Sequence, residues 1–105
     1  QSVRIQQMIQ FMVDITLPTH FDEEFVSRIP SQRAHVNDLM ERGTVMGYNL
    51  ALDRSRLWLT LVARTEQEAM DIVSTFPIFK YFQVRMYALA FHNMATMSLT
   101  KVSLN

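Results

Sequence analysis

The sequence predicts an α+β domain in which a four-stranded antiparallel sheet carries two helices on one face. Four segments alternate apolar and polar residues with a period of two, which is typical of strands. Two further segments repeat apolar residues every three or four positions, as amphipathic helices do. Their order along the chain is β-α-β-β-α-β, the split βαβ pattern of ferredoxin-like folds. With 105 residues, 49% of them hydrophobic, the chain has the size and the apolar content of a single domain.

The first half of the chain predicts a strand and an interrupted helix. Apolar and polar residues alternate over residues 8–17 and predict the first strand. The period lengthens over residues 22–42, which predicts a helix that begins with three acidic residues and ends at Gly43. Pro30 disfavours helical geometry in the residue before it, so we expect a break there, with Ser31 capping the second piece.

The second half predicts a hairpin, a second helix and a last strand. Alternating residues 45–52 and 57–64 flank a polar turn of hairpin length, so they predict two paired strands. Thr65-Glu66-Gln67-Glu68 has the capping-box pattern and predicts the start of a helix that extends to about Thr75. An aromatic-rich connection then leads to a final strand over residues 83–91.

These elements place the folded domain at residues 8–93. The segment 1–7 lacks any such pattern and is expected to be an N-terminal extension. The segment 94–105 is rich in Met, Ser and Thr and alternates only weakly. We expect it to be either a frayed tail or an arm that docks on a second copy of the chain.

Composition excludes several classes of protein. Ten basic residues balance ten acidic ones, so no net charge draws the chain to nucleic acid or to anionic membranes. No apolar stretch reaches the roughly 18 residues of a membrane span, and no signal-peptide pattern occurs, so we expect a cytoplasmic location. The lack of cysteine excludes disulfides and thiolate metal sites. The three histidines form no metal-binding pattern, so neither a metal nor a cofactor is expected.

Both faces of the predicted sheet are largely apolar, which predicts a homodimer or a higher assembly of dimers. In the third strand the leucines suit the helix side, whereas Trp58 and Val62 lie on the opposite side. A sheet with one face in water alternates more cleanly. Because buried apolar surface contributes about 25 cal/mol per Å2, we expect a second copy to cover this face. The polar residues of the face would then line a chamber between two sheets: Gln10, Asp14, Thr60 and Arg64.

Several segments carry a resemblance to a known family. They are the strand that ends in Leu17-Pro18, the helix end at Arg42-Gly43, and the final Leu89-Ala90-Phe91-His92. The most specific is Phe76-Pro77-Ile78-Phe79-Lys80-Tyr81-Phe82, which is similar to a Leu-Pro-Leu-Phe-Pro-Tyr-Met segment before the last strand of that family. The chain thus resembles the muconolactone isomerase family, whose fold is the dimeric α+β barrel. The resemblance implies isomerisation of a small anionic lactone by a base, with cations or donors that hold the enolate and the carboxylate.

Two positions depart from that family. The resemblance implies a glutamate base eleven positions before the glycine that ends the first helix, and this chain has Gln32 there. Glutamine cannot take up a proton at neutral pH and only forms hydrogen bonds. The family's aromatic–arginine pair early in the second strand is replaced by Met46-Gly47-Tyr48-Asn49. Two interpretations stay open: an isomerase with another base, or a ligand-binding or interaction module without one.

The isomerase interpretation needs a base and an anion clamp. Asp14 or His35 is expected as the base, and Arg33 or Arg64 as the clamp. His92 matches the family's terminal histidine and is a further candidate for proton transfer. Asp14 has a plainer interpretation as the salt-bridge partner of Arg64 or Arg85, and the others as exposed or structural residues. A haem-handling relative of the barrel is a weaker third class, with His35 or His92 as the ligand.

Ligand binding needs a pocket with apolar walls and a few polar groups. The candidates are hydrogen-bonding, cationic and aromatic side chains: Gln32, Arg33, Tyr48, Trp58 and Arg64.

Overall fold

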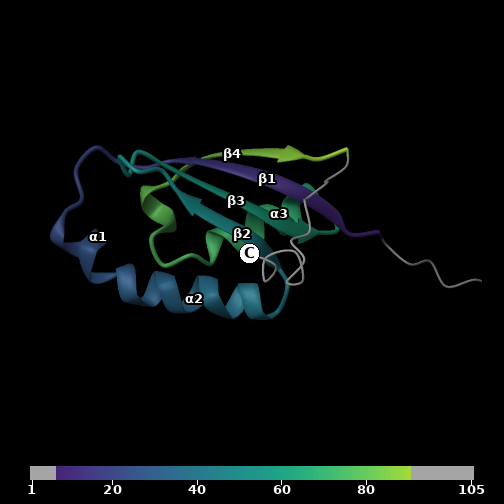
Figure 1. Cartoon of the computed structure of the whole chain (residues 1–105), viewed down its shortest axis with the longest axis horizontal. Helices are drawn as coiled ribbons and strands as arrows, with labels where there is room; N and C mark the ends of the chain where they lie inside the picture. Colours follow the sequence, from purple (N-terminus) through teal and green to yellow (C-terminus); the bar gives the residue numbers. More distant parts are fainter. Residues whose placement is uncertain (1–6, 91–105) are drawn as a thin grey trace, which may run out of the picture.

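The fold follows the predicted order of elements. A computed structural model describes residues 7–90 of the chain. Its elements are β1 (Ile9–Thr16), α1 (Glu23–Ser27), α2 (Ile29–Glu41), β2 (Val45–Leu50), β3 (Arg56–Ala63), α3 (Glu66–Ser74), the 3-10 helix η1 (Phe79–Tyr81) and β4 (Gln83–Ala88). The four strands form one antiparallel sheet in the order β2-β3-β1-β4 (Figure 1). This confirms the predicted α+β, ferredoxin-like architecture.

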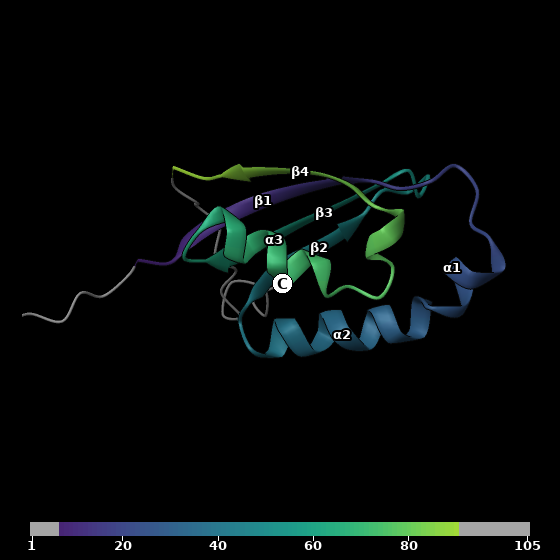
Figure 2. The same ribbon diagram turned by 180° about the vertical axis from the view of Figure 1, so that it is seen from behind.

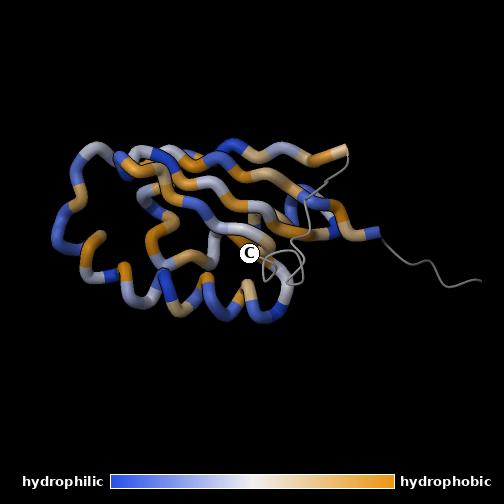
Figure 3. The backbone as a smooth tube through the Cα atoms, viewed as in Figure 1, coloured by the Kyte–Doolittle hydropathy of each residue, from blue (hydrophilic) through white to orange (hydrophobic). Residues whose placement is uncertain are grey.

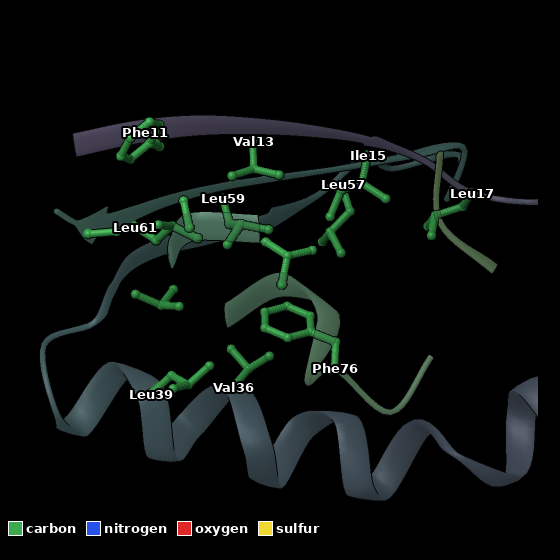
Figure 4. Packing of buried hydrophobic residues seen from close by; sticks show 14 residues of the cluster. Phe11, Val13, Ile15, Leu17, Val36, Leu39, Leu57, Leu59, Leu61 and Phe76 are labelled. Carbon is green, nitrogen blue, oxygen red and sulfur yellow. The ribbon is translucent and has the colours of Figure 1, made fainter. Parts of the chain in front are cut away.

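The hydrophobic core lies between the sheet and the helices. Figures 1 and 2 show α2 and α3 on the same side of the sheet. Along β1 and β3, orange segments recur in Figure 3 between blue and pale ones, and every second residue of these strands is a buried apolar one. The apolar ones point toward the helices in Figure 4 and are nearly inaccessible to solvent: Phe11, Val13, Ile15, Leu57, Leu59 and Leu61. Each such burial contributes roughly 1.5–3 kcal/mol before the loss of chain entropy is counted.

The predicted interruption of the first helix is present, but it lies earlier than expected. α1 ends at Ser27 and α2 begins at Ile29, with Arg28 between them. The expectation that Ser31 caps the second piece was wrong, because α2 has no side-chain cap and Ser31 lies inside it. Pro30 occupies the first turn of α2, where the missing N–H has no helical partner to lose.

The end of α2 and the start of α3 lie where the sequence predicts them. Gly43 adopts a positive φ of 77° after α2, the left-handed conformation that glycine tolerates at a helix C-terminus. Thr65 caps α3, because its hydroxyl accepts a hydrogen bond of 3.0 Å from the Glu68 N–H. The Glu68 carboxylate reaches back to the N–H of Arg64 at 2.8 Å, one residue before the position that a capping box uses.

Strand lengths differ from the prediction by a few residues. β2 ends at Leu50 rather than 52, and Leu52 is 96% exposed in the turn that follows. In that turn the Asp53 side chain accepts hydrogen bonds from the N–H and the hydroxyl of Ser55, while Arg54 has a φ of 63°. β4 ends at Ala88, and Arg64 lies just beyond the end of β3.

One irregularity in the sheet controls which side chains of β2 face the helices. Val45 is opposite Leu61, but Gly47 is opposite Thr60, so Met46 is an extra residue in β2. After this bulge, Tyr48 is opposite Leu59 and shares the helix side with it.

The other face of the sheet is covered by no element within residues 7–90. It exposes 37% of Trp58, 42% of Met46 and 51% of Tyr87. We call this surface the open face; it also carries Asp14, Arg56, Thr60 and Arg85, which follow from the strand register.

Three expectations fall on parts of the chain that the structure does not describe. They are residues 1–6 of the extension expected at 1–7, the tail expected at 94–105, and the role of His92. Among residues 7–90, none of the helices has the length and apolar character that crossing a bilayer requires.

Candidate functional site

A cavity of about 260 Å3 lies on the helix side of the sheet, at the end where α1 joins α2. Its walls are mainly apolar. Phe25 and Val26 of α1, Ile29 of α2 and Phe21 just before α1 form one wall, and Leu50 of β2, Leu57 of β3 and Leu17 just after β1 form the other. An apolar cavity with a few polar groups is the usual form of a small-molecule site, and this one is slightly smaller than the common range of roughly 300–1,000 Å3.

The innermost polar group of the cavity is Gln32, a polar residue with only 2% of its surface exposed. α2 presents it toward the sheet, where its Nε2 donates a hydrogen bond of 3.1 Å to the Tyr48 hydroxyl. Its Oε1 lies 3.4 Å from the backbone nitrogen of Ile78, which donates to it. Both partners are also cavity residues. Gln32 therefore joins three segments of the chain at one point of the cavity wall.

Tyr48 is the other polar group of the inner wall. Burial raises the pKa of its hydroxyl above the usual 10.0, and the hydrogen bond from Gln32 only partly offsets this. The phenol is therefore protonated at neutral pH, where it acts as a hydrogen-bonding group and not as a base.

Two arginines lie at the rim of the cavity. Arg33 follows Gln32 on α2, and Arg54 comes from the β2–β3 turn. Neither forms an ion pair within the described part of the chain. No acidic residue among 7–90 lines the same cavity. The rim therefore carries positive charge that nothing on the cavity wall neutralises.

Comparison with known proteins bears on this site. The family model for muconolactone delta-isomerase matches residues 9–95, most of the chain. The chain belongs to the muconolactone delta-isomerase family. No curated protein that was compared matches it. In this family member, the position to which the resemblance assigns a glutamate base is Gln32, and the structure places it on the cavity wall.

α1 closes the outer end of the cavity and is held by an ionic network. The Glu24 carboxylate accepts hydrogen bonds from Lys80 at 3.0 Å and from Arg28 at 2.7 Å. These contacts keep the pKa of Glu24 below its usual value, with the Lys80 hydrogen bond as the largest cause. The Phe25 and Tyr81 rings pack edge to face, with their centroids 5.0 Å apart. Loss of hydration, and then the charges of Asp22 and Glu24, raise the pKa of Tyr81 to about 12.

Asp14 and Trp58 are on the open face, so the sheet separates them from the cavity. The Asp14 carboxylate forms an ion pair of 3.0 Å with Arg56. Trp58 is its cross-strand neighbour in β3, and Arg85 is its neighbour in β4. Asp14 is therefore a salt-bridge partner, but of Arg56 and not of Arg64 or Arg85, the two arginines expected to pair with it.

His35 and Arg64 lie outside the cavity lining as well. The His35 Nε2 is 2.7 Å from the Thr75 hydroxyl, which itself donates to the Ile72 carbonyl at 2.6 Å. The histidine must therefore donate through Nε2, and it fastens α2 to the end of α3. Arg64 pairs with Glu68 at 3.3 Å at the start of α3, with both side chains well exposed.

The structure thus brings together three of the candidates, Gln32, Arg33 and Tyr48, and separates the others from them. Sequence reasoning missed Arg54 and the Ile78 N–H. The turn position of Arg54 was visible in the sequence, but its left-handed backbone was not. Within residues 7–90, no group of three or more histidine, aspartate or glutamate side chains is placed to hold a metal ion.

Proposed function

We propose that this member of the muconolactone delta-isomerase family binds a small cyclic organic anion in the helix-side cavity. The observation that carries the proposal is the pair of unneutralised guanidinium groups, Arg33 and Arg54, at the rim of a mainly apolar cavity. An apolar ring would replace water against Phe25 and Leu57, while its carboxylate would meet the arginines. The small volume favours a molecule with a single ring.

Binding without turnover is the form of this function that the cavity supports best. Proton abstraction needs a base within hydrogen-bonding reach of the substrate carbon. The described lining contains no carboxylate and no histidine, and Gln32 stands at the position of the family's base. Family membership favours a second candidate, lactone isomerisation, with a base supplied from outside this lining.

Thermal unfolding with muconolactone, and with a lactone of the same ring size that lacks the carboxylate, tests the proposal. A ligand at a hundred times its Kd stabilises the folded state by about 2.7 kcal/mol. We expect a clear rise in Tm with muconolactone and a smaller one with the uncharged lactone. Equal shifts with the two lactones, or none with either, would contradict the proposal.

Charge variants show whether the arginines are responsible. Arg33→Gln and Arg54→Gln are expected to weaken binding of muconolactone several-fold each, since each removes one charged donor. Arg85→Gln is the matched control, because Arg85 lies on the open face. Incubation in deuterium oxide with NMR detection separates the two candidates: the binder leaves the ring protons of the lactone unexchanged, and an isomerase exchanges them.

We also propose that the open face joins two copies of the chain. The support is the exposed apolar area of Trp58, Met46 and Tyr87 on a sheet that needs a second layer. Sedimentation at micromolar concentration is expected to give a dimer, and Trp58→Glu a monomer with unchanged circular dichroism. A wild-type protein that sediments as a monomer would contradict this.

A further inference from the structure

The orientation of the Gln32 amide is fixed by its partner in the backbone. An amide side chain can turn either its oxygen or its nitrogen toward a neighbour. The backbone nitrogen of Ile78 can only donate, so the atom that faces it must be the amide oxygen. The Gln32 Nε2 is then the atom directed at Tyr48, and it donates to the hydroxyl oxygen at 3.1 Å.

This orientation decides the role of the Tyr48 hydroxyl. Because its oxygen accepts from Gln32, its own hydrogen is left for another partner. The hydrogen bonds of residues 7–90 include none that this hydroxyl donates. The phenol also stays protonated across the neutral range, since burial raises its pKa. Among residues 7–90, the Tyr48 hydroxyl is therefore a donor without an acceptor, and the Gln32 nitrogen beside it has one further N–H.

We infer that Tyr48 donates a hydrogen bond to a carbonyl oxygen on the ring of the bound ligand, and that Gln32 is a positioning residue for that donor. This inference rests on the proposed function and assigns a specificity-determining residue: among cyclic anions, Tyr48 selects those that carry a carbonyl on the ring. The carbonyl meets the two inner donors, and the carboxylate meets the arginines at the rim. A ring that offers only donors to this wall leaves the Tyr48 hydrogen unpaired and is disfavoured.

A pair of ligands that differ only at the carbonyl tests the inference. One is a five-membered lactone carboxylate, and the other is the cyclic ether carboxylate of the same ring size. Wild-type protein is expected to prefer the lactone by on the order of tenfold, the value of one well-formed hydrogen bond. The carbonyl stretching band of the bound lactone is expected to move to lower frequency than in water-free solvent.

Variants assign the effect to the residues. Tyr48→Phe removes the donor and keeps the ring, so the preference is expected to fall to about one while the cyclic ether binds as before. The shift of the carbonyl band is lost with it. Tyr87→Phe is the matched control, because Tyr87 lies on the open face. Gln32→Met keeps the Tyr48 hydroxyl but removes the amide that orients it. The carbonyl band of the bound lactone is therefore expected to move less and to be broader than with the wild type.

The outcomes separate the inference from the proposed function. Equal binding of both ligands by the wild type, or an unchanged carbonyl shift in Tyr48→Phe, overturns the inference and leaves the binding function standing. Binding of neither ligand by folded wild-type protein overturns both. Unchanged binding of the cyclic ether by Tyr48→Phe shows that this variant keeps the cavity intact.

Discussion

The two faces of the sheet are built by the same strands and differ in what they do. On the helix side, β1 and β3 bury aliphatic side chains almost completely, and the sheet and α2 enclose the cavity at one end. On the open face, the alternate residues of the same strands are half-buried aromatic, polar and charged side chains. The charged groups also differ: the open face has the Asp14–Arg56 ion pair, whereas Arg33 and Arg54 at the cavity form no ion pair within residues 7–90. The comparison places the core and the cavity of the proposed ligand site on the helix side, and it leaves the open face for the proposed contact between two copies.

A substitution in the core on the helix side should give the largest change in the free energy of unfolding. Leu59 is fully buried, so Leu59→Ala is expected to lower the free energy of unfolding by about 2–5 kcal/mol through lost burial and a new cavity. The same change at the exposed Leu52 is expected to stay within about 0.5 kcal/mol. Urea denaturation measures both, and similar losses for the two would break the comparison.

Gln32→Met should give the next largest effect, because it leaves the buried Ile78 N–H without its acceptor. The expected loss in free energy of unfolding is about 1–3 kcal/mol. Gln83→Met, at an exposed position of β4, is the control and should change little. A stable Gln32→Met protein would show that the amide is not part of the structural framework of the cavity.

The cap of α3 should matter less. Thr65→Ala removes the hydroxyl that accepts from the Glu68 N–H, at an expected cost of about 1 kcal/mol. Thr65→Ser keeps an oxygen at the same place and is expected to recover most of that loss in thermal denaturation. If the alanine variant were as stable as the serine variant, the Thr65 cap would not contribute to the stability of α3.

Asp14→Asn sharpens the comparison from the open face. Its ion pair with Arg56 is partly exposed, so the expected loss of stability is only about 0.2–1 kcal/mol. The Kd for muconolactone is expected to stay unchanged, because the sheet separates Asp14 from the cavity. A clear change in that Kd would assign Asp14 to the binding site after all.

The smallest effect concerns the ionic network at α1. The pKa of Glu24 is lowered in the folded state from 4.5, so its contribution is present above that value and is lost as pH falls through the folded pKa. Glu24→Gln is expected to make the stability less dependent on pH below about 4.5, in denaturation at several pH values. An unchanged pH profile would show that the network does not fasten α1.

Sequence reasoning predicted the elements well because each depends on a local pattern. Alternation located β1 and β3, Thr65 located the start of α3, and Gly43 located the end of α2. The site was predicted only in part. Asp14 and Thr60 lie on the face away from the helices, as expected, but the sequence did not show that Gln32, Arg33 and Tyr48 line a separate cavity on the helix side.

Other parts of the site have no side-chain pattern. The Gln32 Oε1 accepts a hydrogen bond from the backbone N–H of Ile78, a group that every residue except proline provides. Arg54 reaches the rim from a turn whose left-handed backbone is unusual for arginine. Long-range contacts of this kind, across 46 positions for Gln32 and Ile78, appear only once the chain is folded.

The bulge in β2 decides which residues of this strand face the cavity. Met46 adds one residue to the count, and every side chain after it in β2 changes sides. In an unbroken ladder Tyr48 would stand opposite Trp58, outside, and its oxygen would lie in water. Deletion of Met46 should therefore move each following side chain of β2 to the opposite face of the sheet, although the strand loses only one residue. One inserted residue thus decides that the Tyr48 hydroxyl lies at the cavity and not on the opposite surface of the sheet.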